Sequence, residues 1–239
     1  MLIDLHAHSS GVSQCCRISY DAVIHSALDN GLDGIVLTNH YQKSYVCDGD
    51  DSAFARRYTA EFRRAKAYGD KVGCKVFFGA EVTMEQCGGA HVLLYGITED
   101  FIEAHANLFD LTQEELYHTV KSAGRDHIAM VQAHPYRRQK HLLDVRFLDG
   151  VEVNCHPLYG QSNFPDMVEI ATKNRLILTC GGDYHADTYR PKCGMYLPEH
   201  LQSGVEIGQY LLDTDEVQLC IHEPNTGAPY HYTFLTKKQ

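Results

Sequence analysis

The chain has 239 residues, 44% of them hydrophobic and 22% charged, an ordinary globular composition with enough length to bury one full-sized core. These values exclude a disordered chain, a collagen and a coiled coil. The 31 acidic residues outnumber the 21 Lys and Arg and give a formal net charge of −10 with neutral histidines, so binding of extended nucleic acid is not expected. We expect residues 1–239 to form a single domain.

The sequence contains no signal for a membrane or for export. No run approaches the roughly 18 to 20 consecutive apolar residues of a membrane-spanning helix, and the first residues, MLIDLHAHSS, lack the basic and apolar segments of a secretory signal. The nine cysteines are odd in number and form no CxxC motif, which indicates reduced thiols rather than a disulfide framework. We therefore expect a cytoplasmic protein, whose oligomeric state the sequence leaves open.

Short apolar runs alternate with amphipathic segments along the chain, which is the pattern of strands and helices around a parallel sheet. The predicted strands are residues 1–7, 33–38, 74–82, 91–95, 127–133, 150–154 and 175–180. The predicted helices are residues 19–30, 51–68, 112–123 and 164–174, followed by a last helix at 205–212 and a short strand or edge element at 217–222. Ser19 is available to cap the first helix, and Thr112 with Glu115 forms a capping-box pattern in a helix that Gly124 closes. One closed or nearly closed α/β barrel accounts for this order of elements.

Histidines are frequent, and polar residues fall at the carboxyl ends of the predicted strands. With 15 histidines, a single HxH pair is expected about once by chance and carries little weight alone. Residues two apart on a strand share a face, so Asp4, His6 and His8 point the same way, as do Asp183 and His185. Active sites of parallel α/β barrels form at these strand ends, where the chain places His6, His8, His40, Glu81, His134, Asp183 and His185. This constellation predicts a metal site in which Asp4 orients a ligating imidazole.

Five spaced motifs extend the constellation over nearly the whole chain. They are DLHAHSS at the start, GIVLTNH at 34–40, GAEVT at 79–83, AHPY at 133–136 and GGDYH at 181–185. Together they resemble the motifs of the PHP (polymerase and histidinol phosphatase) family. The resemblance implies a distorted (β/α)7 barrel, related to the TIM barrel, that holds two or three divalent metal ions and hydrolyses phosphate esters.

The resemblance also implies a ligand set for the first two metals. Carried over by position, these ligands are His6, His8, Glu81, Asp183, His91 and His134. Glu81 would bridge the two metals, and His91 and His134 would be the other ligands of the second metal.

A third metal would be held by His40 and His185 together with one ligand from the loop after the first strand. Where relatives usually have His or Asp, this chain offers Gln14, Cys15 or Cys16. A cysteine thiolate would favour a softer ion such as zinc, and zinc, manganese and iron all remain open as the metals. The chain also has Asn39 where the family commonly has Asp, which keeps a hydrogen bond but removes a charge.

Such a site favours an anionic substrate. Three divalent ions would bring about +6, and two carboxylate ligands would leave about +4 in the cleft. We assign Glu81, Asp183 and Asp4 to the catalytic centre and expect a metal-activated water to attack directly, without a covalent enzyme intermediate. The candidate substrate-binding residues are Arg17, Arg137 and Arg138. A guanidinium matches phosphate oxygens in a bidentate way. Glu152 and Asn154 end the sixth predicted strand on a shared face and could also reach the cavity.

The leading hypothesis is a phosphatase that acts on a small phosphate monoester, as histidinol phosphatase does. The second is a phosphodiesterase or exonuclease on short oligonucleotides or nucleotides, although the net charge and the lack of basic, aromatic-interleaved stretches argue against a long nucleic acid. An amidohydrolase shares the HxH opening but normally needs a bridging carboxylated lysine, whose place Glu81 would take here. The non-catalytic alternative is a sensor that binds metal or a phosphorylated ligand.

Overall fold

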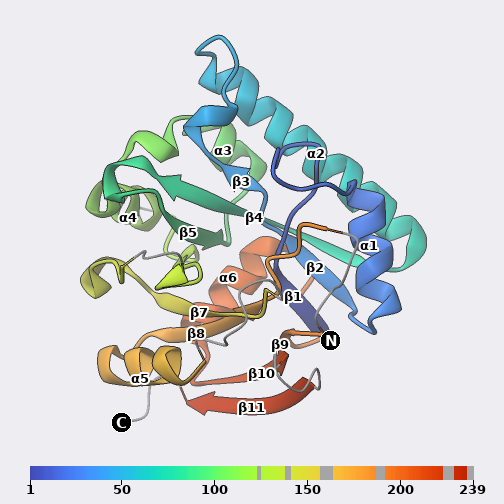
Figure 1. Ribbon diagram of the computed structural model, residues 1–239, viewed down its shortest axis with the longest axis vertical. Coiled ribbons are helices and arrows are strands. Elements are labelled where there is room, and N and C mark those ends of the chain that lie inside the picture. The colour runs from blue at the N-terminus through green and yellow to red at the C-terminus, as the bar shows by residue number, and fades with distance from the viewer. Residues whose placement is uncertain (123–124, 138–140, 157–163, 187–191, 223–228, 236–239) are drawn as a thin grey trace.

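The strands of the computed structural model form one strongly curved sheet (Figure 1). The structure describes residues 1–122, 125–137, 141–156, 164–186, 192–222 and 229–235. Within these ranges the strands are β1 (Leu2–Ala7), β2 (Gly34–Leu37), β3 (His40–Tyr41), β4 (Lys75–Met84), β5 (Ala90–Tyr95), β6 (Ala129–Gln132), β7 (Gly150–Asn154), β8 (Ile177–Gly181), β9 (Gly194–Tyr196), β10 (Glu216–His222) and β11 (Pro229–Leu235). Their order in the sheet is β11-β10-β9-β1-β2-β4-β5-β6-β7-β8, with β3 paired to β4 outside this path.

The sheet curls until its β8 edge returns to β1. Parallel pairs join β1 to β2, β2 to β4, β6 to β7 and β7 to β8. Just beyond β8, an isolated parallel bridge links Ala7 to Tyr184, and the Asp183 amide donates a 2.8 Å hydrogen bond to the His6 carbonyl oxygen. β9, β10 and β11 continue the sheet from β1 as an antiparallel extension. The predicted barrel-like α/β fold is confirmed.

Helices cover this sheet. They are α1 (Tyr20–Asp29), α2 (Asp51–Val72), α3 (Glu99–Ala104), α4 (Gln113–Lys121), α5 (Phe164–Asn174) and α6 (Gly204–Asp213). Helix α1 packs on β2, α2 on β4, α5 on β7 and β8, and α6 on β4, β5 and β6. Short 3-10 turns occur at Lys43–Tyr45, Glu85–Cys87, Leu108–Asp110 and Val145–Phe147. None of the described helices is long and apolar enough to cross a lipid bilayer.

Of the two helix caps predicted from the sequence, one makes its capping hydrogen bonds and the other does not. The Thr112 hydroxyl accepts a hydrogen bond from the Glu115 amide at 3.3 Å, and the Glu115 carboxylate accepts one from the Thr112 amide at 2.8 Å, which is the predicted capping box of α4. Ser19 stands at the N-cap of α1 but makes no capping hydrogen bond, because its hydroxyl contacts the Asp21 carboxylate instead. Gly124, the expected end of the α4 segment, lies outside the described residues.

One strand runs against the expected parallel direction. The chain passes from β4 to β5 through residues 85–89, where Gly88 and Gly89 adopt left-handed φ angles of 64° and 71°. A connection this short leaves no room for a crossover helix, so β5 pairs antiparallel with β4, and β6 in turn pairs antiparallel with β5. This reversal corrects the expectation of a parallel sheet throughout. It also brings the start of β5, with His91, to the rim where the neighbouring parallel strands end.

Candidate metal centre

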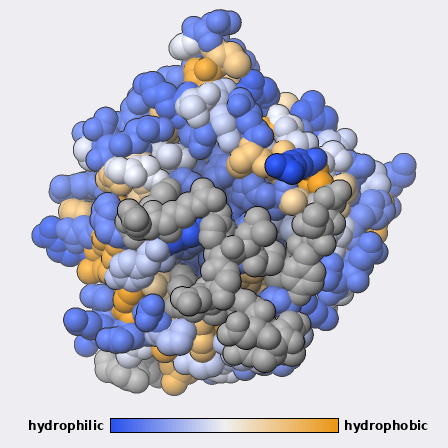
Figure 2. All heavy atoms as spheres, in the orientation of Figure 1, coloured by the Kyte–Doolittle hydropathy of each residue, from blue (hydrophilic) through white to orange (hydrophobic). Residues whose placement is uncertain are grey.

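The polar residues predicted at the strand ends converge on one rim of the barrel. They come from β1 and the residue after it, from β3, β4 and β5, and from the segments that follow β6 and β8: His6, His8, His40, Glu81, His91, His134, Asp183 and His185. Apart from His91 and His185, which are partly exposed, these residues are buried. In Figure 2, which views the face carrying the segments after these strands, hydrophilic residues are visible at the centre.

The Glu81 carboxylate lies at the centre of this group, and its two oxygens face different imidazoles. Its Oε1 lies 2.7 Å from Nδ1 of His91 and 2.8 Å from Nε2 of His134. Its Oε2 lies 2.7 Å from Nδ1 of His40 and 3.4 Å from Nε2 of both His6 and His8. The carboxylate is therefore placed to serve two neighbouring sets of ligands, which is the arrangement of a bridging ligand.

Four buried ligand atoms point at one another without hydrogen-bond partners among the described residues. They are Nε2 of His6, Nε2 of His8, Oε2 of Glu81 and Oδ1 of Asp183. Oδ1 of Asp183 lies 3.6 Å from the His6 nitrogen and 3.3 Å from the His8 nitrogen, and all four ligand atoms fall within 4.8 Å of one another. Buried carboxylate oxygens without partners are costly, and a divalent cation would satisfy all four atoms at once. Imidazole nitrogens with carboxylate oxygens fit zinc, manganese or iron, so the residues present fit the implied metal.

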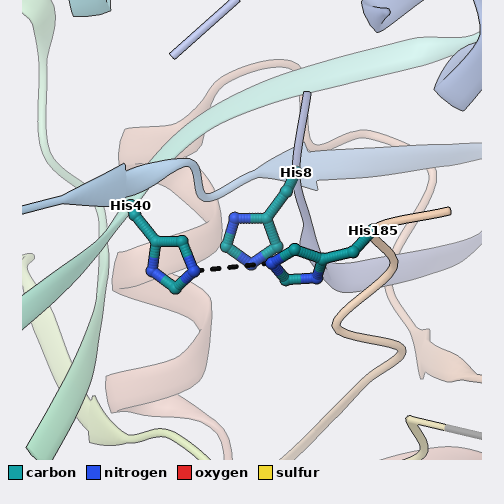
Figure 3. A group of neighbouring side chains, drawn as sticks. All are labelled: His8, His40 and His185. Atoms are coloured by element: carbon teal, nitrogen blue, oxygen red, sulfur yellow. Dashed lines mark hydrogen bonds between the residues drawn. The ribbon is translucent and has the colours of Figure 1, made fainter. Parts of the chain in front are cut away.

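A second group on the same rim consists of His8, His40 and His185, whose ligand atoms also lie within 4.8 Å of one another (Figure 3). The His8 ring centroid lies 4.5 Å from that of His40 and 4.1 Å from that of His185. Of the three candidate ligands in the loop after β1, Cys15 is exposed; burial alone would raise the pKa of its thiol, but the imidazoles of His185 and His40 lower it to about 6. Cys16 is buried and donates to the carbonyl oxygen of His8 instead, at 3.5 Å.

The carboxylate that orients His6 is that of Glu152, not Asp4 as expected. Oε1 of Glu152 lies 2.7 Å from Nδ1 of His6, and its Oε2 accepts hydrogen bonds from the His134 amide at 3.0 Å and the Asn154 side chain at 3.1 Å. Asp4 is fully buried, and its Oδ1 accepts from the backbone amides of His6 and Gly182. In β1 the pairing register shifts between Asp4 and Ala7, so regular alternation of side chains does not hold across the bulge.

Ser13 is a supporting residue that the sequence did not indicate. Its hydroxyl lies 3.2 Å from Nδ1 of His8, donates to the Asn39 side-chain oxygen at 2.9 Å and accepts from the His40 amide at 2.9 Å. The Asn39 oxygen also accepts from the Ser9 amide at 2.7 Å. Asn39 thus fixes the loop that orients His8, and a neutral amide suffices because both of its donors are neutral.

Charge in the cluster keeps its central carboxylate ionised. Burial would raise the pKa of Glu81, but the facing imidazoles, His40 foremost, hold it well below its ordinary value. Burial lowers the pKa of His134 to about 3 and that of His8 well below its usual range. Burial would lower the pKa of His40 too, but Glu81 and Cys15 raise it to about 10, so a cation bound there displaces a proton.

Two of the residues on this rim have unusual backbone conformations. His134 has a φ angle of 31° and Asp183 one of 50°, in the left-handed region that side chains other than glycine rarely adopt. Each is held by a specific hydrogen bond: the His134 amide donates to Glu152, and the Asp183 amide donates to the His6 carbonyl oxygen. Strain of this kind persists where the surroundings enforce it and concentrates at functional sites.

The three candidate phosphate-binding arginines have different surroundings. Arg137 Nη1 contacts Oδ2 of Asp183, so its guanidinium stands at the edge of the cluster. The Arg17 side chain is exposed, and only its backbone amide reaches the site, where it donates to the His185 carbonyl oxygen at 2.9 Å. Arg138 lies outside the described residues. His156, which strand position alone did not indicate, lies near this edge with its ring centroid 6.2 Å from that of His185.

Among the solved structures that share this architecture is a two-domain protein from Bacteroides vulgatus ATCC 8482, which contains a predicted PHP-like metal-dependent phosphoesterase. It matches 93% of this chain with a TM-score of 0.65 at 17% sequence identity. The chain has a PHP-like fold. It spans only 65% of the length of the Bacteroides protein.

A second structure similar to this chain is an amidohydrolase from Chromobacterium violaceum, which holds bound sulfate and no metal. The match covers 88% of this chain and 97% of the amidohydrolase, with a TM-score of 0.55 and 16% identity. No protein-family model and no curated protein sequence matches the chain. At these identities the likenesses establish the fold, and the roles of the residues on the rim stay predictions.

Proposed function

We propose that the protein is a metal-dependent phosphoesterase that hydrolyses a small phosphate monoester. The observation that carries the proposal is the set of four buried ligand atoms on His6, His8, Glu81 and Asp183 that make no hydrogen bond within the described part of the chain, with the second oxygen of Glu81 directed at another pair of imidazoles. The PHP-like metal-dependent phosphoesterase in the Bacteroides protein supports the same reaction class.

In this proposal the protein residues hold two or three divalent cations and orient the phosphate. His6, His8, Glu81 and Asp183 would hold the first cation, and His91 and His134 together with Glu81 would hold a second. When bound, the cations supply an activated water and positive charge for the phosphoryl oxygens. Glu152 keeps Nε2 of His6 directed into the cluster by contacting its Nδ1. Asp4 positions the backbone instead, because its Oδ1 accepts hydrogen bonds from the amides of both His6 and Gly182.

Arg137 is the described arginine best placed to bind the substrate. Its guanidinium is mostly buried, with 15% of the side chain exposed, and one terminal nitrogen contacts Asp183. A guanidinium presents its N–H donors in a planar fork whose spacing matches two phosphate oxygens. Because Asp183 is itself a proposed ligand, this pair would couple the phosphate position to the first cation. A monoester dianion suits this concentration of positive charge better than a diester monoanion.

The test compares turnover of p-nitrophenyl phosphate and bis(p-nitrophenyl) phosphate by protein loaded with manganese or zinc. Monoester turnover that is abolished by a chelator and restored by the metal is the expected result. Preferential diester turnover would replace the proposal with a phosphodiesterase on short oligonucleotides or nucleotides. Absence of both activities in fully loaded protein would leave a metal- or phospholigand-binding sensor and would refute the proposal.

A further inference from the structure

A buried hydrogen-bond network joins helix α2 to the loop that carries His8. Glu61 lies on α2 and is buried, and its Oε1 accepts a 2.8 Å hydrogen bond from the hydroxyl of Ser9, the residue after His8. Its Oε2 accepts from the exposed Arg64 at 2.8 Å. The loop packs closely on this carboxylate, since a Cβ added at Gly11 would lie 2.1 Å from the carboxylate carbon. Burying a carboxylate is costly, and the proposed metal centre gives this one no role.

Backbone donors fix the direction of the hydrogen bonds in this network. The Ser9 amide can only donate, so the Asn39 side-chain atom that it contacts at 2.7 Å is the oxygen. The Asn39 side-chain nitrogen therefore faces the Ser9 hydroxyl, to which it donates at 3.1 Å. The single hydrogen of that hydroxyl goes to Glu61. The Ser9 hydroxyl thus accepts from a neutral amide on one side and donates to a carboxylate on the other.

The same reasoning assigns the ring hydrogen of His8. The Asn39 oxygen can only accept, so the hydrogen of the Ser13 hydroxyl points to it at 2.9 Å. The Ser13 oxygen accepts from the His40 amide at 2.9 Å and faces Nδ1 of His8 at 3.2 Å. Because the hydroxyl hydrogen is already used, Nδ1 of His8 carries the ring hydrogen and donates it to Ser13. Nε2 then presents its lone pair to the cluster, which is the form of imidazole that binds a cation.

A carboxylate at position 39 would disrupt this network. The Ser9 hydroxyl would lie between two carboxylate oxygens, and its one hydrogen could reach only one of them. The other oxygen would meet the lone pairs of the hydroxyl. Two buried carboxylates on one hydroxyl also repel each other, and Arg64 contacts only the Glu61 side. Residue 39 must therefore be neutral as long as residue 61 is Glu.

We propose that Glu61 and Asn39 are a matched pair of positioning residues for His8. Acting through the hydroxyls of Ser9 and Ser13, they keep Nε2 of His8 available to a cation. The pair has one negative charge, so exchanging it between the two positions should preserve the network. In the exchanged pair, Asn39→Asp with Glu61→Gln, the Ser9 hydroxyl would donate to position 39 and accept from position 61. The inference rests on the proposed metal centre and specifies how one of its ligands is held.

A double-variant cycle tests the pair. Zinc affinity is measured by competition with a chelator for the wild-type protein, for Asn39→Asp, for Glu61→Gln and for the exchanged pair. Asn39→Asp should bind zinc at least about tenfold more weakly, the typical effect of a disturbed supporting residue, or fail to fold. Glu61→Gln should lose less, because its amide oxygen can still accept from Ser9. The exchanged pair should fold and bind zinc within about threefold of the wild-type protein, which requires strong coupling between the two substitutions.

The matched control removes a different carboxylate. Glu103 on α3 also accepts from a hydroxyl, that of Thr59 at 2.7 Å, and pairs with an arginine, Arg63. Glu103→Gln should not restore zinc affinity to Asn39→Asp. Equal recovery with Glu103→Gln, or an exchanged pair no better than Asn39→Asp alone, would overturn the proposal.

The ring hydrogen of His8 is read from the ¹⁵N resonances of stripped protein labelled at histidine, a signature that a merely structural role would not move. The wild-type protein and the exchanged pair should carry the hydrogen at Nδ1. Ser13→Ala should move it toward Nε2, which lies 3.3 Å from an Asp183 oxygen and 3.4 Å from a Glu81 oxygen. A hydrogen at Nε2 in the wild-type protein, or no change in Ser13→Ala, would overturn the assignment.

Turnover of p-nitrophenyl phosphate is measured on the same samples and separates this inference from the proposed function. Restored zinc affinity in the exchanged pair without turnover in any sample would support the matched pair and contradict the proposed function. Turnover by the wild-type protein without restored affinity in the exchanged pair would do the reverse.

Discussion

Glu152 offers the sharpest test of how the metal cluster is held, because it touches both sets of ligands without being a proposed ligand itself. It is fully buried and lies 2.7 Å from Nδ1 of His6 and 3.0 Å from the His134 amide. Replacing it with Gln keeps the shape and removes the charge. The two Glu152 oxygens face Nδ1 of His6 and the His134 amide, but a Gln side chain has only one oxygen. At least one of these two nitrogens would therefore face an N–H group instead of an acceptor.

The expected loss follows from these contacts. Mutation of a carboxylate that supports a ligating histidine typically costs about 10- to 100-fold in metal affinity. That range corresponds to roughly 1.4–2.7 kcal/mol of binding free energy. A buried N–H group left without an acceptor also costs about 1–3 kcal/mol of folding stability. Glu152→Gln should therefore bind zinc or manganese at least tenfold more weakly and unfold at lower denaturant concentration.

The assay is a competition titration of metal against a chelator of known affinity, accompanied by chemical denaturation of the stripped protein. Asp149→Asn is the matched control because Asp149 directly precedes β7, accepts a 2.8 Å hydrogen bond from the Met130 amide and forms a 2.8 Å ion pair with Lys121. It should lose stability without losing metal affinity. Unchanged affinity in Glu152→Gln, or an equal loss in Asp149→Asn, would show that the Glu152 contacts do not position the ligands.

Four further substitutions test other parts of the site and the fold. Glu81→Gln should abolish phosphoester turnover and lower the metal content measured by elemental analysis, because it removes the charge shared by two ligand sets; a fully active variant would contradict the two-metal scheme. Arg137→Ala should lower kcat/KM for the monoester by roughly 10- to 100-fold through loss of a charged hydrogen bond, and an unchanged steady-state value would remove Arg137 from substrate binding. Gly181→Ala should destabilise the protein by about 1–3 kcal/mol in denaturant titrations, since overpacking of this kind is costly. The added Cβ would lie 2.4 Å from Cβ of His6, and wild-type stability would mean that β1 and β8 can separate there. Thr112→Ala should cost about 1 kcal/mol by removing the capping box of α4 and leave metal binding unchanged, and a loss of bound metal would show that α4 supports the site.

The sequence predicted that polar residues at strand ends share one rim because their positions follow from simple periodicity, and their role as metal ligands stays a prediction. His8 directly follows β1, Glu81 lies in the second half of β4, and Asp183 lies two residues after β8, so the apolar runs of these strands locate all three. His91 is the exception, since it lies at the start of its strand and was indicated only by the family resemblance. The short turn before His91 indicates its position. Because no crossover helix fits between β4 and β5, β5 must run antiparallel to β4 and begin at the rim.

Other features depended on contacts that sequence patterning does not encode. The bulge in β1 explains why Asp4 does not orient an imidazole as expected. Only the register of β1 against β2 reveals that bulge. Ser13 contacts His8 and His40 through the folding of a loop, for which no periodicity exists. The strand β11 was missed although Tyr230, Tyr232 and Phe234 alternate with more exposed residues, a signal of a half-buried strand.

The turn of the antiparallel β4–β5 hairpin is a site at which this barrel can accept inserted residues. Residues 85–89 join the end of β4, which carries Glu81, to the start of β5, which carries His91, and the space around Gly88 and Gly89 is open. Residues inserted into this turn would leave the spacing of Glu81 and His91 on their own strands intact. Recognition of larger compounds could thus be engineered there by lengthening a single turn.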